Sequence, residues 1–214
     1  MGVQPKVLAE DIKLAVGQAD QKTSDETIGL ATAILGELTE NGLVNLLPPF
    51  VTGDAPPTGG PLLQGKAVQG KLVGMTPPSL TSRMQGEMGF PFATPQLTQM
   101  ASGIVSHFLS SAQIIFKPNG IVGPCTNTAI NPGTLTGAGG GGNIAGLVPG
   151  TLADLMSAGL GPGATPEMKA VAAAIVKHIH TFAVASFPSG FVFAVCAPGG
   201  GPISGGTGNG GKVA

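Results

Sequence analysis

The chain has 214 residues, a net charge of −1 and 10% charged residues, against roughly 25% in an average globular protein. It has no basic patch, so no specific nucleic-acid partner is expected. Two cysteines are too few for a disulfide scaffold. A chain with so few charges solvates a large surface poorly, and we therefore expect other protein to cover much of it.

Glycine and proline occur 36 and 19 times and together make up about a quarter of the chain, a share typical of low-complexity sequences. The 42% content of hydrophobic residues argues against disorder. No apolar segment typical of a signal peptide follows Met1. The apolar stretch 181–198 is interrupted by Pro188 and Gly190, so no transmembrane helix is expected.

The first third of the chain predicts a short helix at 5–17 and a long amphipathic helix after Ser24. Leu30, Ile34, Leu35 and Leu38 form the apolar face of the long helix, and Asn41-Gly42 ends it. The Gly/Pro-rich stretch 52–61 follows and is expected to be an extended arm.

The middle third repeats this order. Thr94 is the expected N-cap and Pro95 the first residue of a helix of about 20 residues. Its apolar positions recur at i, i+3, i+4 and i+7, from Leu97 to Ala112. Short β-favouring runs and the glycine-rich stretch 134–143 come next, the latter again expected to be an arm.

The last third predicts a short helix at 151–158, a long helix starting at Thr165-Pro166, the strand "FVFAVC" and an arm at 199–211. A shift of 71 residues superimposes Thr94-Pro95 on Thr165-Pro166, Phe116 on Phe187 and Cys125 on Cys196. The predicted fold is α+β: three tandem repeats, 1–70, 71–143 and 144–214, arranged as a pseudo-threefold bundle or a short array.

The candidate metal ligands are Glu37, His107 and His178, which occupy equivalent positions in the three predicted repeats. A His₂Glu set with one water is a known zinc arrangement. The alternative, which we prefer, is that all three lie on the polar sides of their helices and contact solvent or a partner. His178 and His180 are two residues apart on one helix and cannot chelate one ion together. No catalytic residue, metal or other cofactor is therefore assigned.

Cys125 and Cys196 are equivalent by position; a disulfide between them is one alternative, and two free, buried thiols are the one we expect. The stretch "GAGGGGN" (137–143) lacks the Lys-Ser/Thr ending of a phosphate-binding loop, so we interpret it as a linker or arm.

Low charge, abundant glycine, the absence of Trp and Tyr, and tandem copies resemble structural proteins of tailed-phage virions, from the neck, tail or baseplate. The resemblance lies in composition and layout, and no family motif transfers a functional residue. It implies a non-enzymatic subunit located in the virion, in contact with copies of itself and with other subunits of the same particle. A membrane-associated protein is the alternative, suggested by a mean hydropathy of +0.34 and the apolar stretch 170–196. A metal-dependent enzyme is the third possibility.

Overall fold

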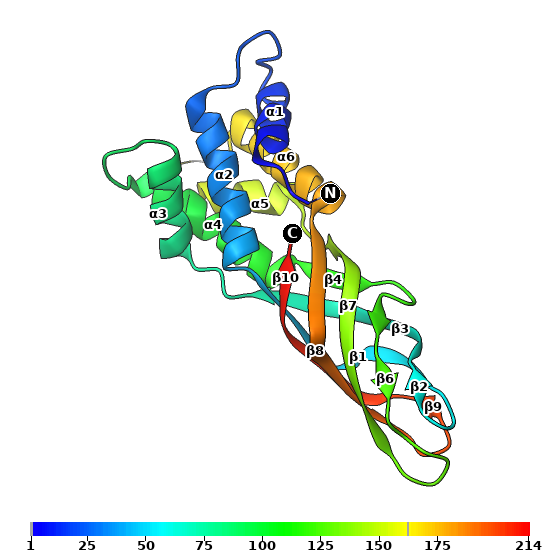
Figure 1. Ribbon diagram of the computed structural model, residues 1–214. Helices are drawn as coiled ribbons and strands as arrows, with labels where there is room; N and C mark the ends of the chain where they lie inside the picture. The colour runs from blue at the N-terminus through cyan, green and yellow to red at the C-terminus, as the bar shows by residue number, and fades with distance from the viewer. Residues whose placement is uncertain (1, 162) are drawn as a thin grey trace. The chain divides into compact units, whose positions relative to one another are not determined.

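The computed structural model describes residues 2–161 and 163–214 and confirms the mixed α+β class (Figure 1). Along the chain, two helices followed by strands occur three times over. The described residues form six helices: α1 (Pro5–Ala15), α2 (Asp25–Glu40), α3 (Pro77–Glu87), α4 (Pro95–Ser111), α5 (Pro149–Ser157) and α6 (Pro166–Phe182). The strands are β1 (Leu43–Ala55), β2 (Gly60–Pro61), β3 (Leu63–Val73), β4 (Gln113–Phe116), β5 (Ile121–Val122), β6 (Pro124–Cys125), β7 (Gly133–Ala145), β8 (Val184–Cys196), β9 (Gly201–Pro202) and β10 (Ser204–Val213).

The chain divides into two compact units. The helical unit contains the chain up to Gly42 together with Gly74–Ala112 and Gly146–Ala183. The strand unit contains Leu43–Val73, Gln113–Ala145 and Val184–Ala214. The stretches 1–73, 74–145 and 146–214 therefore each contribute two helices to one unit and a set of strands to the other.

The three long helices begin as the sequence predicts. The hydroxyls of Ser24, Thr94 and Thr165 each accept a hydrogen bond from the backbone N–H three residues later, at 3.2 Å. Proline follows the cap in α4 and α6, where its missing N–H costs nothing. The end of α2 is also confirmed, because Asn41 is its C-cap residue.

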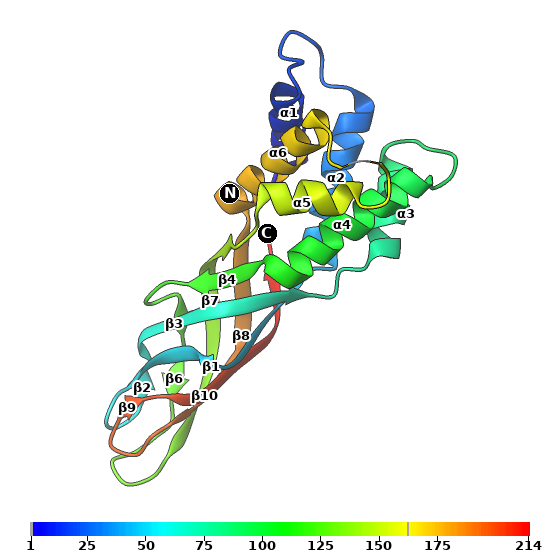
Figure 2. The ribbon, with the colours of Figure 1, turned by 180° about the vertical axis from the view of Figure 1, so that it is seen from behind.

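Helices that follow one another in the chain pack side by side, and α6 packs on α1, so the helical unit closes on itself. Figure 2 shows α4 and α5 next to each other. Gly103 of α4 faces the backbone of Leu155 in α5 so closely that a Cβ there would overlap it. The apolar faces of the helices supply the core of this unit, with Leu8, Ile34, Leu80, Ile104, Leu152 and Ile175 among the buried side chains.

Six strands of the strand unit, β1, β3, β4, β7, β8 and β10, form a closed antiparallel sheet. The pairings run β1–β3, β3–β4, β4–β7, β7–β8, β8–β10 and back from β10 to β1. The glycine-rich stretch 134–143 lies wholly within β7, and residues 204–211 lie within β10. The prediction that these stretches are extended arms is therefore wrong.

The packing of large aromatic side chains explains why glycine occurs at several positions in these strands. The rings of Phe116 and Phe187 lie inside the strand unit with centroids 5.7 Å apart, and both residues are buried. A Cβ on Gly142 would lie 2.7 Å from the ring of Phe116, and one on Gly211 would lie 2.8 Å from the ring of Phe187. The strands can carry only glycine where these rings press against the backbone, since no space remains for a side chain.

We expect Gly142→Val to lower the free energy of unfolding by about 3 kcal/mol, because the new side chain would displace the Phe116 ring in a closely packed interior. Gly140→Val is the matched control in the same strand: its site is exposed and open. Its expected effect is within about 0.5 kcal/mol. Urea unfolding followed by far-UV circular dichroism measures both. Equal effects of the two variants would contradict the packing explanation.

Cys125 and Cys196 form a disulfide, so the expectation of free thiols is wrong. The sheet register brings the two residues to the same end of β7, where Cys125 pairs with Leu135 and Cys196 with Gly133. The backbone at Thr126 and Asn127 lies where a Cβ of Gly133 would be, so this glycine lets the chain after Cys125 cross close to β7. The Cα atoms of the two cysteines are 6.1 Å apart.

The double variant Cys125→Ser/Cys196→Ser should be less stable than the oxidised wild type by about 2–5 kcal/mol, since the bridge closes a long loop. The loop spans 71 residues. Urea unfolding with and without reductant tests this. Reductant should lower the wild-type midpoint to that of the variant and leave the variant unchanged. A wild-type midpoint that does not respond to reductant would show that the bridge contributes nothing.

Candidate functional site

The three residues proposed as metal ligands are all buried. Glu37 is 0%, His107 1% and His178 0% exposed. The interpretation that they face solvent or a partner on the polar sides of their helices is therefore wrong. Buried polar groups need hydrogen-bond partners, and each of these three binds a backbone N–H of a neighbouring helix.

Each partner is the residue just before the proline that opens a short helix. Glu37 of α2 accepts from the N–H of Thr76 before α3, at 3.3 Å. His107 of α4 accepts through Nε2 from Val148 before α5, at 2.9 Å. His178 of α6 accepts through Nε2 from Gln4 before α1, at 3.3 Å. We call these three contacts the Glu37, His107 and His178 clasps.

Each clasp provides a hydrogen-bond acceptor for the N–H of an N-cap residue, as a capping box does. In that motif a side chain three residues into the helix accepts from the N–H of the N-cap residue. Here the acceptor comes from a different helix. An N-cap side chain accepts from an N–H inside the first turn and leaves the N–H of the N-cap residue itself open. The histidines supply acceptors for the N–H groups of Gln4 and Val148, the N-cap residues of α1 and α5. Each clasp thereby ties a long helix to the start of the next short one.

The His107 clasp fixes the protonation of the imidazole. Because Nε2 accepts a hydrogen bond, the proton of the neutral ring is on Nδ1, and Ser111 Oγ lies 3.3 Å from that nitrogen. Burial lowers the pKa of His107 below its ordinary value, which favours this neutral form.

The His178 clasp has a carboxylate beside it. Asp11 Oδ2 of α1 lies 3.7 Å from His178 Nδ1, and Lys177 Nζ lies 3.2 Å from Asp11 Oδ1. Burial lowers the pKa of His178, while the negative charge of Asp11 opposes that shift. The Nδ1 atom is buried without a hydrogen-bond partner, so a small ring rotation would bring it to Asp11.

The Glu37 clasp is the most extensive. Besides the Thr76 N–H, the carboxylate accepts from Asn41 Nδ2 and Ser79 Oγ, both at 2.8 Å. Arg83 Nε lies 3.7 Å from Glu37 Oε2, and the same guanidinium pairs with the exposed Glu40. A fully buried carboxylate is tolerated because these donors replace its hydration.

The three clasps bind three separate helix starts. Among residues 2–161 and 163–214, no group of three or more His, Cys, Asp or Glu side chains is arranged to hold a metal ion. The signal for the clasps was present in the sequence as Pro5, Pro77 and Pro149, which are spaced 72 residues apart and open the three short helices. The sequence interpretation used only the prolines of the long helices.

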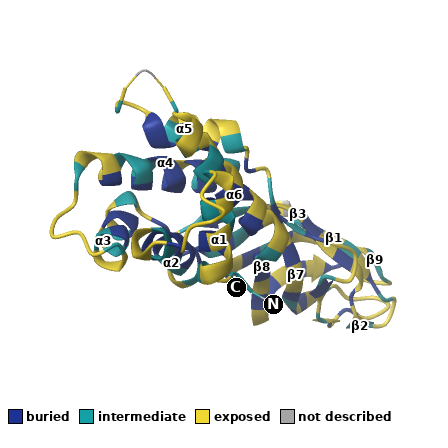
Figure 3. Ribbon diagram, turned by 90° about the horizontal axis from the view of Figure 1, so that it is seen from above, coloured by how far each residue is buried: buried dark blue, intermediate teal, exposed yellow. Residues whose placement is uncertain are grey.

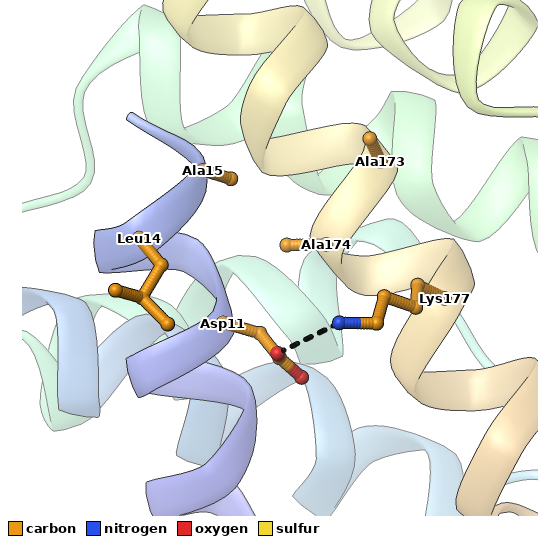
Figure 4. Close-up of a pocket in the computed structure, with 6 residues that line it drawn as sticks. All are labelled: Asp11, Leu14, Ala15, Ala173, Ala174 and Lys177. Atoms are coloured by element: carbon orange, nitrogen blue, oxygen red, sulfur yellow. Dashed lines mark hydrogen bonds and ion pairs between the residues drawn. The ribbon is translucent and has the colours of Figure 1, made fainter. Parts of the chain in front are cut away.

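A pocket of about 330 Å³ lies between α1 and α6, as Figure 4 shows. Its polar groups are Asp11 and Lys177, which form an ion pair, and its other lining side chains are Leu14, Ala15, Ala173 and Ala174. This lining contains no Ser, Thr, Cys or His side chain. At this pocket the Asp11–Lys177 ion pair links α1 to α6, and the rest of the lining is aliphatic.

The strand unit carries an exposed apolar stripe on β8. Phe191, Phe193 and Val195 alternate with buried residues and are 45%, 50% and 49% exposed. The alternation of buried and exposed positions along this unit is visible in Figure 3. Thr136 and Thr207 flank Phe193 on the neighbouring strands, and neither β7 nor β8 contains a charged residue. We call Phe191, Phe193 and Val195 the β8 stripe.

The fold and these contacts define an α+β protein with a helical unit tied by three buried clasps and a closed sheet with an uncharged exposed stripe. In the part of the chain that the structure describes, no helix is both long and apolar enough to cross a bilayer. No protein-family model, curated protein or solved structure matches the chain.

Glu37→Ala should destabilise the protein by about 3 kcal/mol, because the Thr76 N–H and the Ser79 hydroxyl lose their acceptor and Asn41 Nδ2 keeps only Ser79. Glu40→Ala is the matched control, since it removes a neighbouring carboxylate from the same arginine at an exposed position. Its expected cost is much smaller, because an exposed ion pair contributes little to stability. Chemical unfolding measures both, and a Glu37→Ala variant as stable as the control would contradict a structural role for the clasp.

Proposed function

We propose that this chain is a non-enzymatic structural subunit of a large symmetric assembly, of the kind that builds the tail, baseplate, neck or capsid-associated parts of a phage virion. The observation that carries the proposal is the β8 stripe. Half-exposed aromatic side chains with uncharged neighbours such as Thr136 and Thr207 are typical of protein contact surfaces. The low charge of the whole chain supports the same conclusion.

The three helix–helix–strand segments are, in this proposal, tandem repeats related by pseudo-threefold symmetry. Several sets of residues spaced by 70 and 71 positions have matching surroundings. Ser24, Thr94 and Thr165 cap the long helices. Glu37, His107 and His178 form the clasps. The ring-shaped order of helix contacts and of strand pairings also agrees with a threefold arrangement within each unit.

A chain built in this way suits a place on a symmetry axis. It would present three similar surfaces to its neighbours, as a trimer of identical subunits does. The glycine-rich stretches are strands rather than free arms, so the proposed contacts are made by exposed side chains such as those of the β8 stripe. The partners would be copies of this chain and other subunits of the same particle.

Association with a membrane surface is a second candidate, because exposed phenylalanines also insert into lipid interfaces. The β8 stripe has no basic residue within β7 or β8 to attract anionic lipid, which favours a protein partner. Flotation with vesicles of mixed neutral and anionic lipid separates the two candidates: an assembly subunit stays in the bottom fraction.

The direct test is sedimentation velocity of the purified chain over a wide concentration range. We expect self-association that weakens about tenfold or more in Phe191→Ser/Phe193→Ser, because the variant removes two exposed aromatic contacts. Leu14→Ser, an equally exposed apolar position in α1, is the control and should associate like the wild type. A wild type that remains a monodisperse monomer at high concentration would contradict the proposal.

A further inference from the structure

We propose that the His107 clasp is an acid-sensitive release point of the helical unit: protonation of its imidazole detaches the start of α5 from α4, while α1 stays attached to α6 and α3 stays attached to α2. The inference goes beyond the proposed assembly function and does not depend on it. It rests on the different partners that surround the three clasps.

The geometry of the His107 clasp leaves no place for a second ring proton. Nε2 lies 2.9 Å from the backbone nitrogen of Val148, which already donates its hydrogen to it. A proton on Nε2 would place two donors face to face and remove the only acceptor for that N–H. Nδ1 donates toward Ser111 Oγ in both protonation states, so protonation gains no compensating bond there.

The charged residues of the neighbouring helices do not stabilise a cation at His107. In α5 the acidic residue is Asp154, which is exposed. In α3, Arg83 is paired with Glu40, and Glu87 is exposed. Burial is the cause of the lowered pKa of His107, and no carboxylate opposes it.

The His178 clasp responds differently because Asp11 lies beside it. When His178 is protonated, its Nε2 also loses the N–H of Gln4. However, its Nδ1 faces Asp11 Oδ2 at 3.7 Å, and this carboxylate belongs to α1. An imidazolium–carboxylate pair therefore keeps α6 attached to α1, with Lys177 on the other carboxylate oxygen. The Glu37 clasp contains no imidazole and keeps its four partners.

The direction of the pH effect follows from proton binding. The folded-state pKa of His107 lies below the ordinary value of 6.5, so below that pH the unfolded chain binds more protons than the folded chain. The stabilising contribution is complete above pH 6.5 and declines as the pH falls toward the folded-state pKa. Release is thus expected on mild acidification and is reversed at neutral pH.

Hydrogen–deuterium exchange read by mass spectrometry at pH 7.5 and pH 5.5 tests this on the full chain, with rates corrected for the intrinsic effect of pH. We expect protection at the start of α5 to fall by up to about tenfold at pH 5.5, because one pH unit below the ordinary pKa of an imidazole favours the opened, protonated form by about that factor. Protection within α1 beyond Gln4, and at the start of α3, should change less than about threefold.

His107→Gln is the decisive variant, since its amide oxygen accepts the same N–H but does not titrate in this range. It should keep α5 protected at both pH values, whereas His178→Gln should leave the acid response of α5 intact. As a measurement on the wild type, NMR should show the Val148 amide shifting together with the titration of the His107 ring. Equal loss of protection at all three helix starts, or an unchanged α5 at pH 5.5, would overturn the proposal.

Discussion

The helical unit depends on one requirement that occurs three times: the N–H of the residue before a short helix needs a hydrogen-bond acceptor. Each short helix begins with a proline, and the N–H of the preceding residue is directed into the protein rather than to water. A buried N–H without an acceptor costs as much as a lost hydrogen bond, so each long helix must supply an acceptor at that depth. Glu37, His107 and His178 do so. Because the acceptor and the donor lie on different helices, satisfying the helix start also fixes how neighbouring helices pack.

The strand unit is governed by a different constraint, the space needed by a few aromatic rings. Phe116 and Phe187 fill the interior of a narrow closed sheet, and glycines such as Gly142 and Gly211 provide the room for them. A high glycine content is usually associated with flexible chain. In this unit glycines such as these are instead positions at which a side chain would not fit, and Gly142 and Gly211 pair with Ala185 and Val44 of neighbouring strands.

The local structure could be predicted from sequence, and the pairing between distant segments could not. The caps at Thr94 and Thr165 follow from the chemistry of a hydroxyl before proline, and the helix faces follow from periodicity. The burial of Glu37 was not predictable, because its donors Ser79 and Arg83 come from a helix some 40 residues away. Cys125 and Cys196 meet only because β7 separates and aligns them, and no local pattern contains that register.

The differences among the three clasps are as informative as their similarity. In a trimer of identical chains, equivalent positions must carry the same residue, so all three contacts would share one pH response and one stability. A single chain with three related segments is free of that restriction. If the segments are repeats, as we propose, substitution at one position has produced a carboxylate with four partners, an imidazole beside a carboxylate, and an imidazole beside a hydroxyl. Fusion into one chain therefore allows one junction of a threefold unit to open while the other two remain closed.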